Sequence, residues 1–124
     1  MTPYSLYLHI PFCVHRCAYC DFNTYAGQED LIPTYVDALC REIEYVGSRA
    51  AALAPVHTIF FGGGTPSLLS PIQFKKILKT IHDQFDILDL SGVETTMEAN
   101  PGTCSFAQLL DLHSIGINRI SYGV

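Results

Sequence analysis

The alternation of β-prone runs with helical patterns is the feature that most constrains the fold of this 124-residue chain. Short apolar runs that favour strands are followed by segments in which apolar residues recur every three or four positions. We expect strands at 5–10, 56–61, 93–99 and 119–124, and helices at 33–47, 70–85 and 106–116. Such alternation predicts right-handed βαβ units and a parallel sheet. The expected fold is α/β, a partial TIM-like (β/α) barrel with about three βα units and a fourth strand.

Proline, serine and glycine mark the expected helix ends. Pro33 suits the first turn of a helix, and Ser70 with Pro71 forms a cap and first-turn pair. Gly47 and Gly116 follow the last apolar positions of the first and third helical patterns, so we expect these helices to end there.

Composition and charge exclude several classes of function. The chain is 48% hydrophobic and 15% charged, which is typical of a folded domain. Seven Lys and Arg against twelve Asp and Glu give a net charge of -5, which argues against nucleic acid or an anionic membrane as partner. No apolar run approaches the roughly twenty residues of a membrane span, and no signal segment precedes the first strand. We therefore expect no integral membrane segment and a cytoplasmic protein.

Three of the five cysteines, Cys13, Cys17 and Cys20, form a C-x3-C-x2-C pattern directly after the first expected strand. An odd count and this crowding disfavour a disulfide framework. In a barrel, reactive groups gather on the loops that follow the strands. A cubane [4Fe–4S] cluster usually takes four thiolates, so three cysteines leave one iron open to a cofactor or substrate. The spacing predicts such a cluster.

Two other interpretations of the cysteine pattern stay open. Positions i, i+4 and i+7 share one face of a helix, so the three cysteines are alternatively small buried residues. They are also compatible with zinc, with His9 or His15 as fourth ligand. Cys40 lies on the apolar face of the first helical pattern and is expected to pack, and Cys104 is expected not to be a ligand.

The run YLHIPFCVHRCAYCDF at 7–22, with FGGGTP at 61–66, resembles the radical S-adenosylmethionine (SAM) family that contains oxygen-independent coproporphyrinogen III oxidase and the haem chaperone HemW. The resemblance covers nearly the whole chain. It implies that the amino and carboxylate groups of SAM bind the open iron, and that a separate electron donor reduces the cluster. We therefore expect residues 1–124 to be the N-terminal part of a radical SAM core domain, with the rest of the barrel and a C-terminal domain absent.

The glycine run after the second strand is expected to stop that strand and form a special loop. No Lys-Ser or Lys-Thr follows Gly64, and 62–67 does not fit the dinucleotide pattern, which disfavours a nucleotide-phosphate site. Glycines let a backbone approach a ligand closely. The resemblance implies that Gly63, Gly64 and Thr65 hold SAM, and the alternative is a simple tight turn.

Four side chains acquire roles from the resemblance. It implies SAM contacts for Glu98, at the end of the third expected strand, and for Tyr7 and Tyr19, and it places His9 beside the cluster. Without the resemblance, a carboxylate at a strand end is more often solvated or a cap, and the tyrosines are more often packed aromatics. No catalytic residue is assigned.

Position 22 separates two expected functions. In the decarboxylase-like pattern a further cysteine follows the third with one residue between, whereas this chain has Phe22, as in the haem-chaperone pattern. The resemblance thus favours a chaperone that binds haem and delivers it to haem-accepting proteins, with the haem site beyond residue 124. The alternative is an enzyme that oxidatively decarboxylates coproporphyrinogen.

Overall fold

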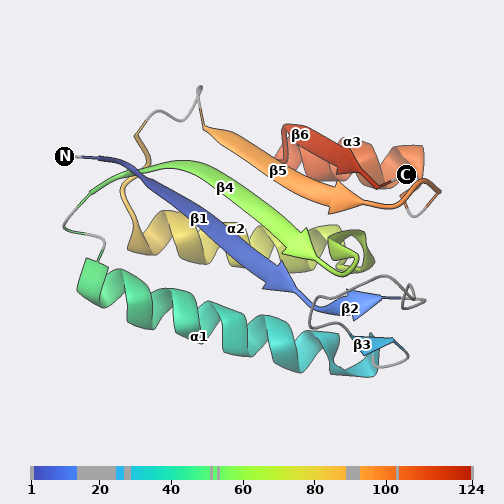
Figure 1. The fold of residues 1–124 in the computed structure, drawn as a ribbon, viewed down its shortest axis with the longest axis horizontal. Helices are drawn as coiled ribbons and strands as arrows, with labels where there is room; N and C mark the ends of the chain where they lie inside the picture. Colours follow the sequence, from blue (N-terminus) through green and yellow to red (C-terminus); the bar gives the residue numbers. More distant parts are fainter. Residues whose placement is uncertain are drawn as a thin grey trace.

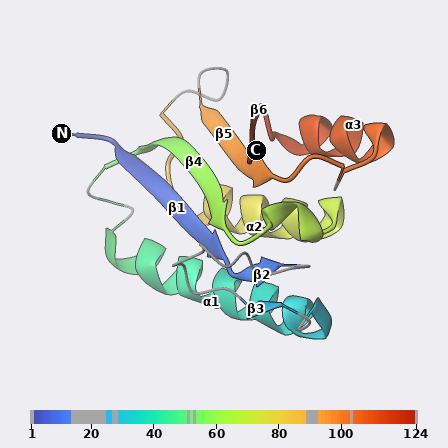
Figure 2. The same cartoon turned by 45° about the vertical axis from the view of Figure 1, so that its right-hand side comes forward.

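The computed structural model describes residues 2–13, 25–26, 29–50, 52, 54–88, 93–102 and 104–123. Within them a parallel four-stranded sheet has the order β1-β4-β5-β6. Its strands are β1 (Tyr4–Ile10), β4 (Val56–Gly63), β5 (Glu94–Ala99) and β6 (Arg119–Tyr122). The helices α1 (Ile32–Ala50), α2 (Pro71–Gln84) and α3 (Phe106–Ile115) lie on one face of this sheet (Figures 1 and 2). The α/β class and the parallel sheet are confirmed.

The register gives the sheet two different faces. Leu8, Phe61 and Met97 are paired neighbours that point toward the helices and are at most 5% exposed. One residue earlier in each strand, the side chains point to the opposite face, where Tyr7 of β1 is 57% exposed. In a closed barrel this second face is the interior. The described residues therefore form a sheet that is packed on one side and open on the other.

The packed face holds the hydrophobic core. Phe74, Ile77 and Ile81 of α2 are fully buried, and the ring of Phe74 meets that of Phe61 edge to face at 5.0 Å. Each such side chain stabilises the fold by about 1.5–3 kcal/mol. Ser70 caps α2 through a complete capping box, as its sequence predicts.

Two glycine predictions were wrong in position. Helix α1 continues through Gly47 to Ala50. Gly47 is buried, and a Cβ there would lie 2.7 Å from the Gln84 Cβ of α2. This glycine allows two helices to approach closely instead of ending one. Strand β4 likewise continues into the glycine run, since Gly63 pairs with Ile10 of β1.

Helix α3 has the expected bounds and ends at Gly116, whose φ is +120°. Its side chains are arranged differently from the expected apolar pattern. Leu112 is the buried residue of this helix, whereas Phe106 is 76% exposed and Leu110 is 55% exposed.

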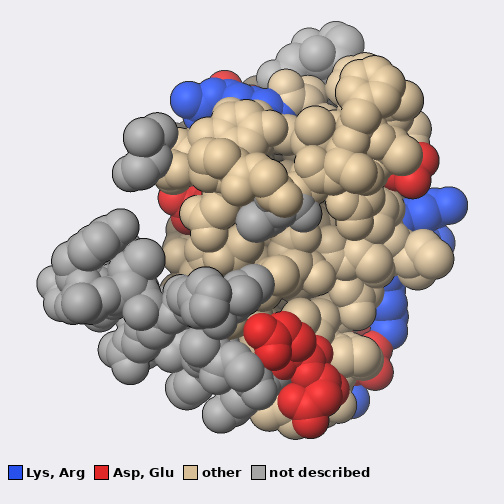
Figure 3. All heavy atoms as spheres, turned by 90° about the vertical axis from the view of Figure 1, so that its right-hand side faces the viewer, with Lys and Arg blue, Asp and Glu red and all other residues tan. Residues whose placement is uncertain are grey.

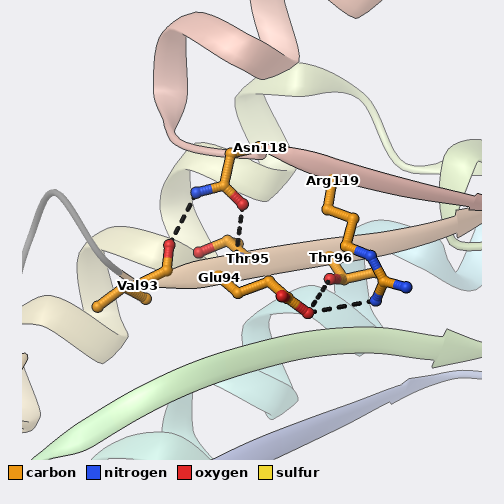
Figure 4. A network of polar contacts seen from close by, with 6 residues as sticks. All are labelled: Val93, Glu94, Thr95, Thr96, Asn118 and Arg119. Atoms are coloured by element: carbon orange, nitrogen blue, oxygen red, sulfur yellow. Dashed lines mark hydrogen bonds and ion pairs between the residues drawn. The ribbon is translucent and has the colours of Figure 1, made fainter.

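Side chains at the amino ends of β5 and β6 fix the register of this strand pair (Figure 4). The Asn118 amide accepts a hydrogen bond from the Thr95 N–H at 2.8 Å and donates one to the Val93 carbonyl at 2.7 Å. On the open face, Arg119 pairs with Glu94 at 3.2 Å. These contacts hold β6 in line with β5.

Two very short strands were not predicted. β2 (Phe12–Cys13) pairs in parallel with β3 (Tyr25–Ala26), so that the backbone of Cys13 lies beside that of Ala26. A short 3-10 turn, η1 (Glu29–Leu31), leads into α1, and another, η3 (Pro66–Leu68), follows the glycine run. No helix in the described residues is long and apolar enough to cross a membrane.

Candidate functional site

The carboxyl ends of β1, β4 and β5 meet at one edge of the sheet, at the tips of the arrows in Figure 1. A hollow of about 510 Å³ opens there, lined by Tyr7, His9, Phe60, Gly63 and Glu98. Figure 3 views the molecule from the side toward which the strands point. Uncharged residues make up most of the coloured surface in this view, and the Lys and Arg side chains lie at its margins. This arrangement gives no broad cationic patch for a polyanion on the part of the face that is coloured.

An aromatic wall bounds the hollow. The ring of Tyr7 stacks on Phe60, with centroids 5.8 Å apart and an interplanar angle of 16°. The Tyr7 hydroxyl lies 3.3 Å from Nδ1 of His9, within hydrogen-bond distance. Partial burial, and then the nearby Glu98 carboxylate, raise the pKa of Tyr7, so its hydroxyl is neutral over the physiological range. The wall therefore presents uncharged, flat surfaces to a ligand.

The Glu98 carboxylate faces the glycine run across the sheet. Its Oε1 accepts a hydrogen bond from the Gly63 N–H at 3.0 Å. The φ of Gly63 is +113°, and a Cβ there would lie 2.8 Å from the His9 ring. A Cβ on Gly62 would lie 2.7 Å from Glu98 Oε1 and 2.9 Å from the ring of Tyr7. Glycine at both positions thus leaves a cradle that any side chain would fill.

These features fit SAM as a ligand. A carboxylate suits the SAM ammonium group, bare backbone allows the close approach that the cradle needs, and aromatic rings suit flat or apolar parts of a ligand. The structure brings Tyr7, Gly63 and Glu98, three of the predicted SAM contacts, together around one hollow. Tyr19, the other predicted SAM contact, lies outside the described residues.

The last two residues of the predicted SAM loop connect it to the segment before the cysteines. The Gly64 N–H donates to the Ile10 carbonyl at 2.8 Å, and the Thr65 N–H donates to the Phe12 carbonyl at 2.7 Å. The Thr65 side chain is buried, and its hydroxyl accepts a hydrogen bond from Asn100 Nδ2 at 3.1 Å. Gly64 and Thr65 therefore face the cysteine-bearing strand, although Gly63, directly before them, lines the hollow.

Cys13 is the predicted cluster ligand that the structure describes. Its thiol is buried at the end of β2, and a Cβ on Gly64 would lie 2.7 Å from its sulfur. Because Cys13 lies in a strand, the interpretation of the three cysteines as one helical face is wrong at this position. The other two predicted ligands, Cys17 and Cys20, lie outside the described residues, as do His15 and Phe22.

The described residues contain no group of three His, Cys, Asp or Glu side chains that could hold a metal ion. Cys40 is buried in the core on α1, where packing was expected. Cys104 is partly buried against the same core before α3. The buried Cys13 thiol beside Gly64 fits a thiolate ligand of a cluster.

Sequence reasoning missed two residues of this site. Phe60 lines the hollow, whereas its neighbour Phe61 is buried. Both stand in an apolar strand, so the local sequence does not indicate which of the two rings is buried. Asn100 supports Thr65, but Asn-Pro-Gly is typical of an ordinary turn. Alternation along β4 separates the two phenylalanines once one face is known to be packed.

Comparison with known proteins places this geometry in a family. Residues 7–124 match the Radical SAM superfamily. The heme chaperone HemW of Escherichia coli is 40% identical over the whole chain, and that of Bacillus subtilis is 44% identical over 97% of it. The chain spans about a third of the length of these relatives, 32% and 31%.

A solved structure extends the likeness from sequence to fold. Coproporphyrinogen III oxidase (HemN) from Escherichia coli, a radical SAM enzyme by its description, matches 98% of this chain with a TM-score of 0.88 at 33% identity. The match covers 28% of that protein, which is consistent with a partial TIM-like barrel. By the family match and this shared fold, the chain belongs to the radical SAM superfamily.

Proposed function

We propose that this chain is the N-terminal part of the core domain of a HemW-like haem chaperone that carries a [4Fe–4S] cluster and SAM. Cys13, Cys17 and Cys20 would hold the cluster. The observation that carries the proposal is the buried Cys13 thiol packed beside Gly64, next to a glycine cradle with a carboxylate at its edge. Two relatives named heme chaperone HemW, 40% and 44% identical over nearly the whole chain, support the same assignment.

The residues of the site have separate tasks in this proposal. Glu98 would bind the SAM ammonium while its Oε1 keeps the Gly63 N–H in place. The cradle at Gly62 and Gly63 would admit the amino-acid end of SAM, and the rings of Tyr7 and Phe60 would exclude water from one side. When bound, cluster and SAM supply one-electron chemistry that these side chains lack.

The chaperone is preferred to the alternative, oxygen-independent coproporphyrinogen III oxidase. Phe22 stands where the decarboxylase-like pattern has a further cysteine. Haem, haem-accepting proteins and an electron donor are then the partners, with the haem site in the remainder of a longer protein. We also propose a cytoplasmic location, because free thiolates persist in reducing compartments.

Anaerobic reconstitution of the full-length protein tests the cofactor part of the proposal. We expect about four irons with matching sulfide, and loss of the intact cluster in Cys13→Ala or Cys17→Ala. Cys40→Ala, a buried cysteine away from the site, is the matched control and should retain the cluster. Stoichiometric zinc without iron, or a normal cubane spectrum in Cys17→Ala, would contradict the proposal.

Calorimetric titration with SAM tests the role of the glycine loop in SAM binding independently of the cluster. Gly63→Val should abolish SAM binding with the cluster intact, because a branched side chain would collide with His9 and resist a positive φ. Wild-type affinity in this variant would mean that the loop is only a turn.

Two assays on the full-length protein separate chaperone from enzyme. Haem titration should show binding, and an anaerobic assay with reductant, SAM and coproporphyrinogen should yield no protoporphyrinogen. Sustained vinyl-porphyrin formation over many turnovers would favour the enzyme instead.

A further inference from the structure

The three glycines of the loop do not face the same surroundings. A Cβ on Gly62 would meet side chains of the hollow, among them the Glu98 carboxylate, and a Cβ on Gly63 would meet the His9 ring and the Ile10 carbonyl. A Cβ on Gly64 would instead lie 2.5 Å from the Phe12 carbonyl oxygen and 2.7 Å from the Cys13 sulfur. Real Cβ atoms are essentially never found at these separations, so the close approach of the cysteine strand requires glycine at position 64.

The backbone at the Cys13 end of this contact has little freedom to move away. The Phe12 carbonyl accepts the Thr65 N–H, and β2 is paired with β3 on another side. The Phe12 side chain is 3% exposed and meets the ring of Tyr35 edge to face at 5.4 Å. A methyl group at position 64 would therefore displace the loop or the thiol, since a packed backbone does not yield cheaply.

The Gly64–Thr65 side of this contact is held by a residue that follows strand β5. Asn100, which follows β5 and is exposed, donates a hydrogen bond to the hydroxyl of Thr65, which is 3% exposed. The contacts thus run from Asn100 through Thr65 to the Phe12 carbonyl and on to Cys13.

We infer that the Gly64–Thr65 corner, braced by Asn100, positions the Cys13 thiolate for the cluster. Gly64 and Asn100 are then positioning residues for a metal ligand. The inference rests on the proposed function, in which Cys13 is a cluster ligand. Residues that orient a metal ligand commonly change metal affinity by about 10–100-fold when replaced.

Gly64→Ala and Gly62→Ala form a matched pair, because each adds one methyl group to the same glycine run but toward different neighbours. In anaerobically reconstituted full-length protein, Gly64→Ala should hold about half or less of the wild-type iron and sulfide. Gly62→Ala should keep the wild-type iron content and bind SAM more weakly. Equal iron content in Gly64→Ala and the wild type would overturn the inference.

Asn100→Ala tests the brace without adding bulk, so it decides the matter if Gly64→Ala does not fold. Release of iron to a chelator should be about tenfold faster than in the wild type. Asn118→Ala is the control, since it removes an amide from the far end of β5, and it should release iron at the wild-type rate. An unchanged rate of iron release in Asn100→Ala would overturn this inference and leave the proposed function standing. A wild-type protein that binds no cluster would overturn both the inference and the proposed function.

Discussion

Phe60 and Phe61 are neighbours in β4 that belong to different parts of the molecule. Phe61 is fully buried on the packed face against Phe74, whereas Phe60 stacks on the exposed Tyr7 and lines the hollow. The same alternation runs along β5, where Met97 is buried and Glu98 reaches the glycine cradle. Each strand thus divides its residues between the packed core and the hollow where we propose that SAM binds, and the two sets can be changed independently.

The largest expected effect is on the packed face. Phe61→Ala should lower the free energy of unfolding by about 3–5 kcal/mol, because it removes a fully buried ring and leaves a cavity. Phe60→Ala should cost about 1 kcal/mol, the scale of one lost aromatic contact, and should weaken SAM binding. Urea unfolding of both cluster-loaded variants measures this, and equal losses of stability would refute the division of the sheet into two faces.

Glu98→Gln should leave folding intact and weaken SAM binding about tenfold, which corresponds to about 1.4 kcal/mol. Glutamine still accepts the Gly63 N–H but has no charge for the SAM ammonium. Glu94→Gln is the matched control, since Glu94 lies on the same strand and face but pairs with Arg119 at the far end. Calorimetric titration of both variants decides, and an equal loss in the control would indicate a general charge effect.

The packed face was predictable because burial imposes a period on the sequence. The apolar spacing of Phe74, Ile77 and Ile81 predicted α2 with its cap at Ser70, and both are observed. Gly47 could not be placed, because its use depends on the approach of a second helix, which no local pattern records.

The open face was predictable only in part. The resemblance indicated Tyr7, Gly63 and Glu98, and the structure brings these residues to one hollow. Asn100 was missed because its partner Thr65 is remote in sequence. The separation of Gly64 from its neighbouring glycines was also missed, since it depends on the strand pair β2–β3, whose two-residue strands are too short for a periodic signal.

Gly47→Ala tests whether α1 and α2 are packed against each other as tightly as the helices are packed against the sheet. Alanine favours a helix by about 0.5–1 kcal/mol over glycine, but the added Cβ would lie 2.7 Å from that of Gln84. Overpacking of this kind costs about 1–3 kcal/mol, so we expect a net loss of about 1 kcal/mol. Urea unfolding measures it, and Gln84→Gly in the same background should relieve the clash. A gain in stability from Gly47→Ala alone would show that the helices separate freely.

The smallest expected effect lies on the open face and concerns pH. Partial burial, and then Glu98, raise the pKa of Tyr7 in the folded protein, so the folded state resists loss of the phenolic proton. Stability associated with neutral Tyr7 is therefore fully present below the ordinary tyrosine pKa of about 10 and is lost as pH rises from there through the raised value. Tyr7→Phe should unfold like the wild type near neutral pH and lose less stability above about pH 10. Urea midpoints from pH 8 to pH 11 measure the difference, with Tyr45→Phe, an exposed tyrosine on α1, as control. A wild-type protein that gains stability relative to Tyr7→Phe as pH rises would show that the Tyr7 hydroxyl is not held neutral by the site.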